Sequence, residues 1–496
     1  MNIAALASAF LLLLAVGHQY ADAFAVNPRG FGNSASGGVG SKSKKRLVDA
    51  GVVEKIEEVN VSPSVSPVMA AYALSARGAE MQQQGRLNGA VSAFTEALAL
   101  HPTADRRFLL AMALEENGEP HKAVAMYDWA CQSHDAGADA ILRHDAAIKL
   151  ADLCANDLGD VERAIRYVDA AMAEDGYAHS TFSNAAAFDQ KAFYLAEQGN
   201  LGEAILLWDA AIEGTEEGEL VTHNNMGEEA VSRAVARSHL GRFFRAVANI
   251  LLGHDQEAEA AFATLPVECQ YMVDSWNYIA TAHYPQEQRV LQSVQPVQQN
   301  GRRKVGRLFT GPFTILEEAL ASARPNGLVC EFGVFHGKSI RILASMVGQD
   351  IVDGFDTFEG IPEAWGDDPA GTYTAAAEIP PVPDNVRFHV GLFSDTLPGY
   401  VASLEPPEDL PVRLINVDCD LYQGTVEILH HLANRIGPGC VICFDEYLMT
   451  PTWPDDEYKA FQEACAKFKW EYEYLSFSLF SKQAVVRITA SESFVG

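Results

Sequence analysis

The chain has 496 residues, of which 48% are hydrophobic and 21% are charged, as in an ordinary globular protein. This length exceeds what one hydrophobic core supports, so we expect two or three domains. The formal net charge of −30 argues against general nucleic-acid binding, because an acidic surface repels phosphates. The eight scattered cysteines suggest no disulfide framework, and the pair Cys440 and Cys443, inside an apolar run, predicts two packed core thiols.

The first 68 residues have the pattern of a targeting segment and a linker. An apolar stretch at 3–16 and the small residues Ala21 and Ala23 predict a signal peptide over 1–23. Phe24 and the basic Gly/Ser-rich stretch after it resemble the two-part presequence of algae with complex plastids, so we expect a disordered transit segment or linker over 24–68. Plain secretion is the alternative. No later stretch is long and apolar enough to predict a transmembrane helix.

Residues 69–283 carry a recurring unit, in which a glycine precedes an alanine, a large apolar residue and a second alanine at fixed spacing. The first copy is Gly85, Ala90, Phe94 and Ala97, and later copies begin at Gly118, Gly159, Gly199 and, more weakly, Gly253. The glycine ends one helix, and the small residues let the next helix pack closely. The unit resembles the tetratricopeptide repeat, and an irregular Ala-rich helical domain is the alternative. A stacked helical array implies a possible protein partner.

A Gln-rich connector at 284–307 precedes a second region, 308–490, whose pattern predicts strands as well as helices. Residues from Leu328 predict a strand that ends near Glu331 and Gly333, and Gly337 and Ser339 open a helix, which is the pattern of a ligand-binding βα unit. The glycines do not follow the G-x-G-x-x-G spacing of NAD enzymes.

The acids of this region favour S-adenosylmethionine as the ligand. Glu331 disfavours a phosphate near the turn and suits a cationic ligand end, which this compound has. Asp356 ends the next predicted strand, where a carboxylate can accept both ribose hydroxyls. An enzyme that uses NAD or a nucleotide sugar is an alternative to this interpretation.

Acidic residues end two later strands. The segment "RLINVDCD" places Asp418 and Asp420 after an apolar run, and Asp445 and Glu446 follow "GCVICF". If these strands are neighbours, the carboxylates converge and suit Mg²⁺. Such a metal lowers the pKa of a substrate hydroxyl, and Asp418 or Asp420 can take the proton. Alternatively, the two aspartates cap the next helix.

The motifs "CEFGVFHGKS", "GFDTFEGIPEAW", "VDCDLYQGTVEIL" and "GPGCVICFDEY" together resemble the macrocin O-methyltransferase family over about residues 305–490. Of the two aspartates that can take the proton, we predict Asp418 as the catalytic residue. The resemblance implies dependence on S-adenosylmethionine and Mg²⁺. It implies cofactor contacts at Glu331, Gly333, Gly337, Ser339 and Asp356, and metal ligation by Asp418, Asp445 and Glu446. The family usually has aspartate where this chain has Glu446.

The sequence therefore predicts an α/β Rossmann-like methyltransferase domain with a terminal antiparallel hairpin, preceded by an all-α helical repeat domain. The expected reaction is methyl transfer to a sugar or polyol hydroxyl. The alternative is a helical scaffold whose methyltransferase-like domain is inactive and binds a protein partner.

Overall fold

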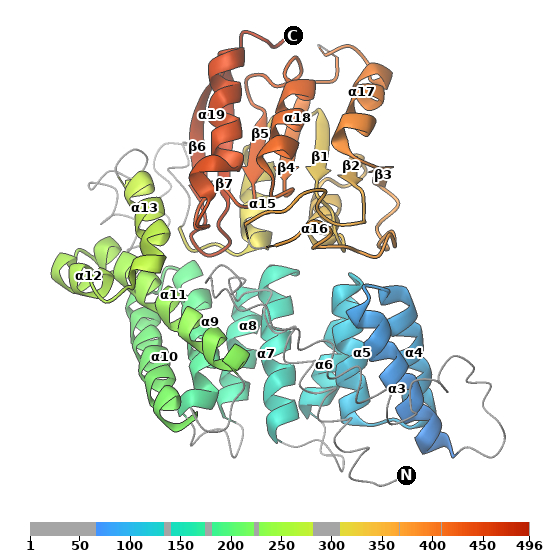
Figure 1. Cartoon of the computed structure of the whole chain (residues 1–496), viewed down its shortest axis with the longest axis vertical. Coiled ribbons are helices and arrows are strands. Elements are labelled where there is room, and N and C mark those ends of the chain that lie inside the picture. Colours follow the sequence, from blue (N-terminus) through green and yellow to red (C-terminus); the bar gives the residue numbers. More distant parts are fainter. Residues whose placement is uncertain are drawn as a thin grey trace. The chain divides into compact units, whose positions relative to one another are not determined.

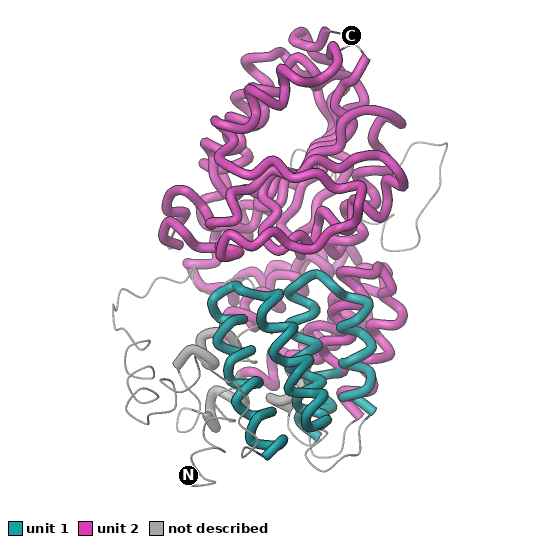
Figure 2. Tube along the Cα trace, turned by 90° about the vertical axis from the view of Figure 1, so that its right-hand side faces the viewer, with its two compact units in different colours: residues 1–23, 31–146 teal, residues 24–30, 147–496 magenta. Residues whose placement is uncertain are grey.

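A computed structural model of the chain describes residues 66–132, 140–173, 181–222, 228–280, 308–366, 368–407 and 409–495. The predicted signal peptide (1–23), nearly all of the predicted segment 24–68 and the connector 284–307 lie outside these residues. The chain divides into two compact units, and among the described residues the boundary lies between Ala146 and Ala147 (Figure 2). Within the described ranges, no helix has the length and apolarity needed to cross a membrane.

The first unit consists of helical hairpins. Its helices are α3 (Pro67–Gln83), α4 (Leu87–Leu100), α5 (Ala104–Glu116), α6 (Pro120–Gln132) and the start of α7 (Ala140–Asn156). Helix α3 begins two residues before the predicted start at 69, because Ser66 caps it and Pro67 suits a first helical position. The predicted large residue Phe94 is fully buried, and a Cβ built on Gly78 would lie 2.9 Å from its ring.

The second unit opens with helices of the same kind. They are α8 (Val161–Met172), α9 (Thr181–Glu197), α10 (Leu201–Thr222), α11 (Glu228–Leu252), α12 (Asp255–Phe262), the 3₁₀ turn η4 (Val267–Cys269) and α13 (Gln270–Tyr278). The glycine of each predicted repeat follows a helix in the left-handed region, with φ between 68° and 87°. The helical fold is confirmed, whereas the tetratricopeptide assignment stays a prediction.

The second unit also contains a seven-stranded sheet in the order β3-β2-β1-β4-β5-β7-β6. Its strands are β1 (Leu328–Phe332), β2 (Val352–Asp356), β3 (Val386–Val390), β4 (Val412–Val417), β5 (Val441–Phe444), β6 (Glu471–Phe477) and β7 (Ala484–Ala490). The pairs among β1 to β5 are parallel, and β7 is antiparallel to both β5 and β6. The predicted mixed sheet with a terminal antiparallel hairpin is therefore confirmed (Figure 1).

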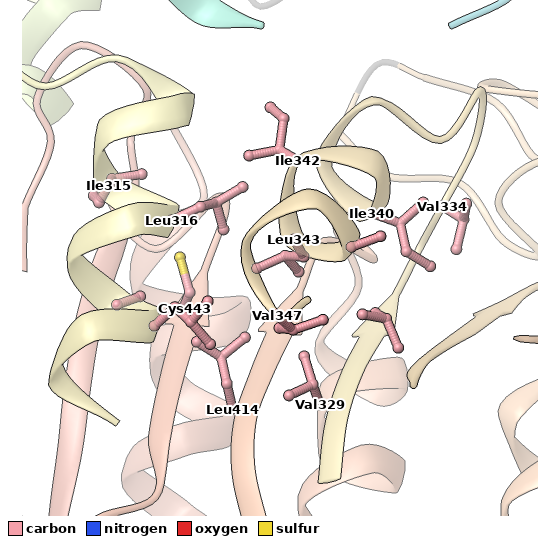
Figure 3. Close-up of a cluster of buried hydrophobic side chains, with 14 of the residues drawn as sticks. Ile315, Leu316, Val329, Val334, Ile340, Ile342, Leu343, Val347, Leu414 and Cys443 are labelled. Atoms are coloured by element: carbon pink, nitrogen blue, oxygen red, sulfur yellow. The ribbon is translucent and has the colours of Figure 1, made fainter. Parts of the chain in front are cut away.

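Helices cover both faces of this sheet. Helices α15 (Pro312–Ser322) and α16 (Lys338–Met346) lie on one face, where Leu316, Leu343, Val329 and Leu414 share a buried cluster (Figure 3). Helices α17 (Phe393–Ser403), α18 (Tyr422–Leu432) and α19 (Glu457–Phe468) lie on the other, and the turn η6 (Trp453–Asp455) precedes α19. The central strands β1, β4 and β5 are buried almost throughout, as expected for a parallel sheet with helices on both faces.

The boundary between the compact units differs from the connector predicted at 284–307. Aromatic residues explain the difference, because Phe193 of α9 stacks on Phe480 at a centroid distance of 4.0 Å. Trp208 of α10 and Phe244 of α11 both lie about 6 Å from the ring of Phe309. These contacts join the later helices to the sheet in one unit.

Candidate active site

The carboxyl ends of β4 and β5 bring two of the predicted acids together. The Asp445 amide donates to the carbonyl oxygen of Val417 at 2.9 Å, so the parallel ladder continues one step beyond both strands. Asp418 and Asp445 therefore occupy neighbouring positions on strands that lie about 4.8 Å apart. The two carboxyl groups that follow these strands therefore lie at the same edge of the sheet.

The glycine turn after β1 lies directly against Asp418. The Asp418 amide donates to the carbonyl oxygen of Phe332 at 2.8 Å, and a Cβ built on Gly333 would lie only 1.6 Å from the Asp418 carbonyl oxygen. Gly333 also has a φ of 86°, which L side chains rarely adopt. Gly337, with a φ of 76°, begins α16 at the other end of the turn. Glycine is thus required where the predicted cofactor turn meets the predicted metal ligand.

Asp356 holds the same turn from the end of β2. One carboxylate oxygen accepts the amides of Val334 and Phe335 at 2.6 and 2.8 Å, and the other accepts the amide of Phe358 at 2.7 Å. These bonds fix the backbone of the turn, a task that the sequence analysis did not assign to this residue. A carboxylate has about four acceptor sites, so these bonds leave room for one ribose hydroxyl. The predicted contact with both hydroxyls stays a prediction.

Glu331 lies fully buried beneath the turn. Its two oxygens accept hydrogen bonds from Ser339 Oγ at 3.0 Å and from Asn416 Nδ2 at 3.1 Å. Burial raises the pKa of Glu331 to about 8, although these two hydrogen bonds oppose the shift. Glu331 and Ser339, both predicted as cofactor contacts, thus bond to each other, while Asn416, inside an apolar strand, carried no signal for a site.

Burial and mutual repulsion raise the pKa values of the acids at the sheet edge. Burial is the main cause for Asp418 and Asp445, whose pKa values lie well above their usual range, and repulsion from neighbouring carboxylates adds to it. Burial and the charge of Glu446 raise the pKa of Asp420 to about 8. Carboxylates that raise one another's pKa values form a site that a cation stabilises.

Three residues that the sequence analysis missed surround this cluster. Lys482 Nζ lies 2.9 Å from an oxygen of Glu446, and Gln483 donates to Asp445 at 2.5 Å. The Glu446 amide donates to Glu457, a fully buried acid at the start of α19. The two partners from the β6–β7 connection lie about 36 residues further along the chain, and no spacing pattern in the sequence links them to the acids.

The cluster has the donor chemistry of a cation site. Across the described ranges, no group of three or more His, Cys, Asp or Glu side chains is arranged to hold a metal ion. One oxygen each of Glu446 and Glu457 is nonetheless buried without a hydrogen-bond partner. Carboxylate oxygens are the type of ligand that Mg²⁺ prefers, so the chemistry of these donors, though not their arrangement here, suits this ion. The predicted core packing of Cys440 and Cys443 is confirmed, since both are fully buried.

Part of the C-terminal region is similar to known methyltransferases. A family model described as a methyltransferase domain matches residues 330–447. The 8-demethyl-8-(2,3-dimethoxy-alpha-L-rhamnosyl)-tetracenomycin-C 4'-O-methyltransferase of Streptomyces olivaceus is 32% identical over 156 residues, which cover 27% of this chain and 57% of that protein. The demethyldecarbamoylnovobiocin O-methyltransferase of Streptomyces niveus is 29% identical over 171 residues, which cover 29% of this chain and 62% of that protein.

Among solved structures, the structure of the O-methyltransferase NovP is similar, with 25% sequence identity and a TM-score of 0.27. The match covers 36% of this chain and 81% of the NovP chain. The matches thus span about three fifths of the length of these curated relatives. Residues 330–447 are therefore similar to a methyltransferase domain.

Proposed function

Because residues 330–447 are similar to a methyltransferase domain, we propose that the chain transfers a methyl group from S-adenosylmethionine to a hydroxyl of a sugar or another polyol. The close approach of Gly333 to the Asp418 carbonyl oxygen carries the proposal. It puts the predicted donor turn and the acid cluster at one point of the sheet edge, where a methyl donor and an acceptor hydroxyl can meet. Both relatives are O-methyltransferases, one named for a rhamnosyl-tetracenomycin and the other for demethyldecarbamoylnovobiocin, and these names support oxygen as the acceptor atom.

The chain's own residues would orient the donor and remove the proton. S-adenosylmethionine supplies an electrophilic methyl group on a sulfonium. Asp356 holds the turn that would bind it, and Glu331 provides a negative charge beneath the turn once it is ionised. As the hydroxyl oxygen bonds to the methyl carbon and the carbon–sulfur bond breaks, the hydroxyl proton passes to Asp418 or Asp420. Burial and the charge of Glu446 raise the pKa of Asp420, so this residue would accept a proton more readily than an ordinary aspartate.

A divalent cation would be held by Asp418, Asp445 and Glu446. Bound there, Mg²⁺ would supply Lewis-acid stabilisation of the acceptor oxygen. The buried oxygen of Glu446 that lacks a hydrogen-bond partner supports its assignment as a ligand, although the family resemblance leads one to expect aspartate. Lys482 partly neutralises Glu446, so metal binding would compete with this ion pair.

A labelled-methyl assay of the full chain against glycans and polyol metabolites, with and without Mg²⁺, tests the proposal. We expect Asp445→Ala to abolish transfer while S-adenosylmethionine affinity, measured by calorimetry, stays nearly unchanged. Asp395→Ala, which removes an exposed acid of α17, is the matched control and should keep full activity. Full turnover of the Asp445 variant would show that the cluster is not the metal site.

The alternative is a helical scaffold whose methyltransferase domain is inactive. The helical hairpins of residues 67–278 favour it as a second candidate, because arrays of this kind commonly bind proteins. Absence of S-adenosylmethionine binding by the full chain would favour the scaffold.

A further inference from the structure

Helix α13 contacts the segment 445–456, which joins β5 to α19 and begins with the acid pair Asp445 and Glu446. The Tyr278 hydroxyl at the end of α13 lies 2.9 Å from the Tyr474 hydroxyl of β6, which lies 2.6 Å from the Tyr447 hydroxyl. Tyr447 is fully buried and directly follows Glu446. A chain of three hydroxyls therefore links the helical part of the second unit to the backbone beside a predicted metal ligand.

A second contact from α13 fixes the backbone of the same segment. The Met449 amide donates to Ser275 Oγ at 3.0 Å, and Ser275 is fully buried. Met449 has a φ of 64°, in the left-handed region that side chains disfavour. The hydrogen bond from outside the segment helps to hold this uncommon backbone conformation in place.

The aromatic ring of Tyr278 makes a third contact. Its centroid lies 5.6 Å from the ring of Trp453 and 5.3 Å from that of Tyr458, the latter edge-on. Tyr458 directly follows Glu457, which accepts the Glu446 amide at 3.1 Å. Both ends of the segment are thus packed against one helix.

Regular structure does little to hold this segment. Between the end of β5 at Phe444 and the start of α19 at Glu457, the backbone contains bends, turns and the short 3₁₀ turn η6. Its position therefore depends on contacts with its surroundings, which include a 3.2 Å hydrogen bond from the Leu448 amide to the Lys482 carbonyl oxygen as well as side-chain contacts. The contacts described above come from α13, which lies about 170 residues earlier in the chain.

We propose that α13 is a positioning element for the acid pair, with Ser275 and Tyr278 as its positioning residues. The metal-related part of this inference rests on the proposed function, whereas the backbone part does not. The helical part of the second unit would then complete the active site in addition to any partner binding. Variation at α13 would change metal affinity with little effect on the methyl donor.

Hydrogen exchange of the full chain tests the backbone part without reference to activity. Ser275→Ala removes the acceptor of the Met449 amide, and we expect that amide to exchange at least about five-fold faster, the factor that corresponds to one net hydrogen bond. Tyr278→Phe keeps the ring and removes the hydroxyl, so the amides near Tyr447 should exchange faster too. Asn277→Ala, an exposed neighbour on the same helix, is the matched control. Exchange over 446–453 that matches this control in both variants would overturn the proposal.

Binding of Mn²⁺, followed by electron paramagnetic resonance, tests the metal part. We expect Tyr278→Phe to weaken Mn²⁺ binding about five-fold and to leave the dissociation constant of S-adenosylmethionine unchanged, a split that general destabilisation would not give. Equal weakening of both ligands would overturn the positioning role. If the unaltered chain binds no Mn²⁺, the proposed metal site fails, and the exchange experiment still decides the role of α13.

Discussion

The approach of Gly333 to Asp418 allows a sharp prediction for Gly333→Ala. A Cβ at this position would lie 1.6 Å from the Asp418 carbonyl oxygen, whereas ordinary contact begins at 3.4 Å. The turn and the end of β4 must therefore separate by almost 2 Å. The positive φ of 86° adds backbone strain of about 1–2 kcal/mol. Overpacking of this kind costs roughly another 1–3 kcal/mol.

Gly348→Ala carries the backbone strain alone, so the difference between the two variants isolates the cost of the overlap. Gly348 has a φ of 70°, and a Cβ there meets nothing within 4 Å, so this variant carries the strain without the overlap. Scanning calorimetry of both variants compares them with the unaltered chain. An extra cost of about 1–3 kcal/mol predicts that Gly333→Ala unfolds about 2–12 °C below Gly348→Ala, on the scale of about 2–4 °C per kcal/mol for a domain of this size.

The activity assay adds a second readout to the same pair. Displacement of Asp418 should abolish methyl transfer in Gly333→Ala, and Gly348→Ala should retain it. Equal melting temperatures for the two variants would refute the reasoning, because the carbonyl of Asp418 would then not lie against the turn.

Three further predictions concern charge. Removal of divalent ions with EDTA should abolish methyl transfer, and Mg²⁺ should restore it; activity that persists in EDTA would contradict the metal assignment. Lys482→Met should tighten Mn²⁺ binding, measured by calorimetry, because it removes the cation that competes at Glu446, and it should lower the melting temperature. Because the pKa of Glu331 is raised to about 8 in the folded state, its contribution to stability falls as pH rises from about 4.5 to about 8. Glu331→Gln should therefore flatten the pH dependence of the melting temperature over that window, and an unchanged slope would show that Glu331 is not the titrating group.

The sequence predicted those features that depend on local pattern. The apolar runs that end in Asp418 and Asp445 belong to strands of a parallel sheet, whose shared edge follows from the strand order. The repeated glycines mark helix ends, because a positive φ is required there and glycine adopts it without strain.

The features that the sequence did not predict depend on contacts between distant segments. Lys482 follows β6 in a turn with a φ of 63°, and nothing near it in the chain points to Glu446. Asn416 has the position of a core residue in β4, and its role appears only when β1 brings Glu331 beside it. The contact between Ser275 and Met449 joins segments 174 residues apart, which no periodicity records.

The energetics of the acid cluster favour an active enzyme over an inactive scaffold. Each pKa raised by burial marks a carboxylate whose charge the folded chain disfavours, and Asp418, Asp420 and Asp445 share this property. A buried ionic group is often replaced by apolar residues without loss of stability. A scaffold that binds proteins through its helices gains nothing from such a cost at the end of a sheet, whereas a cation that binds there removes the repulsion. Buried carboxylates at the end of a sheet break the rule of apolar packing, and such departures are typical of functional sites.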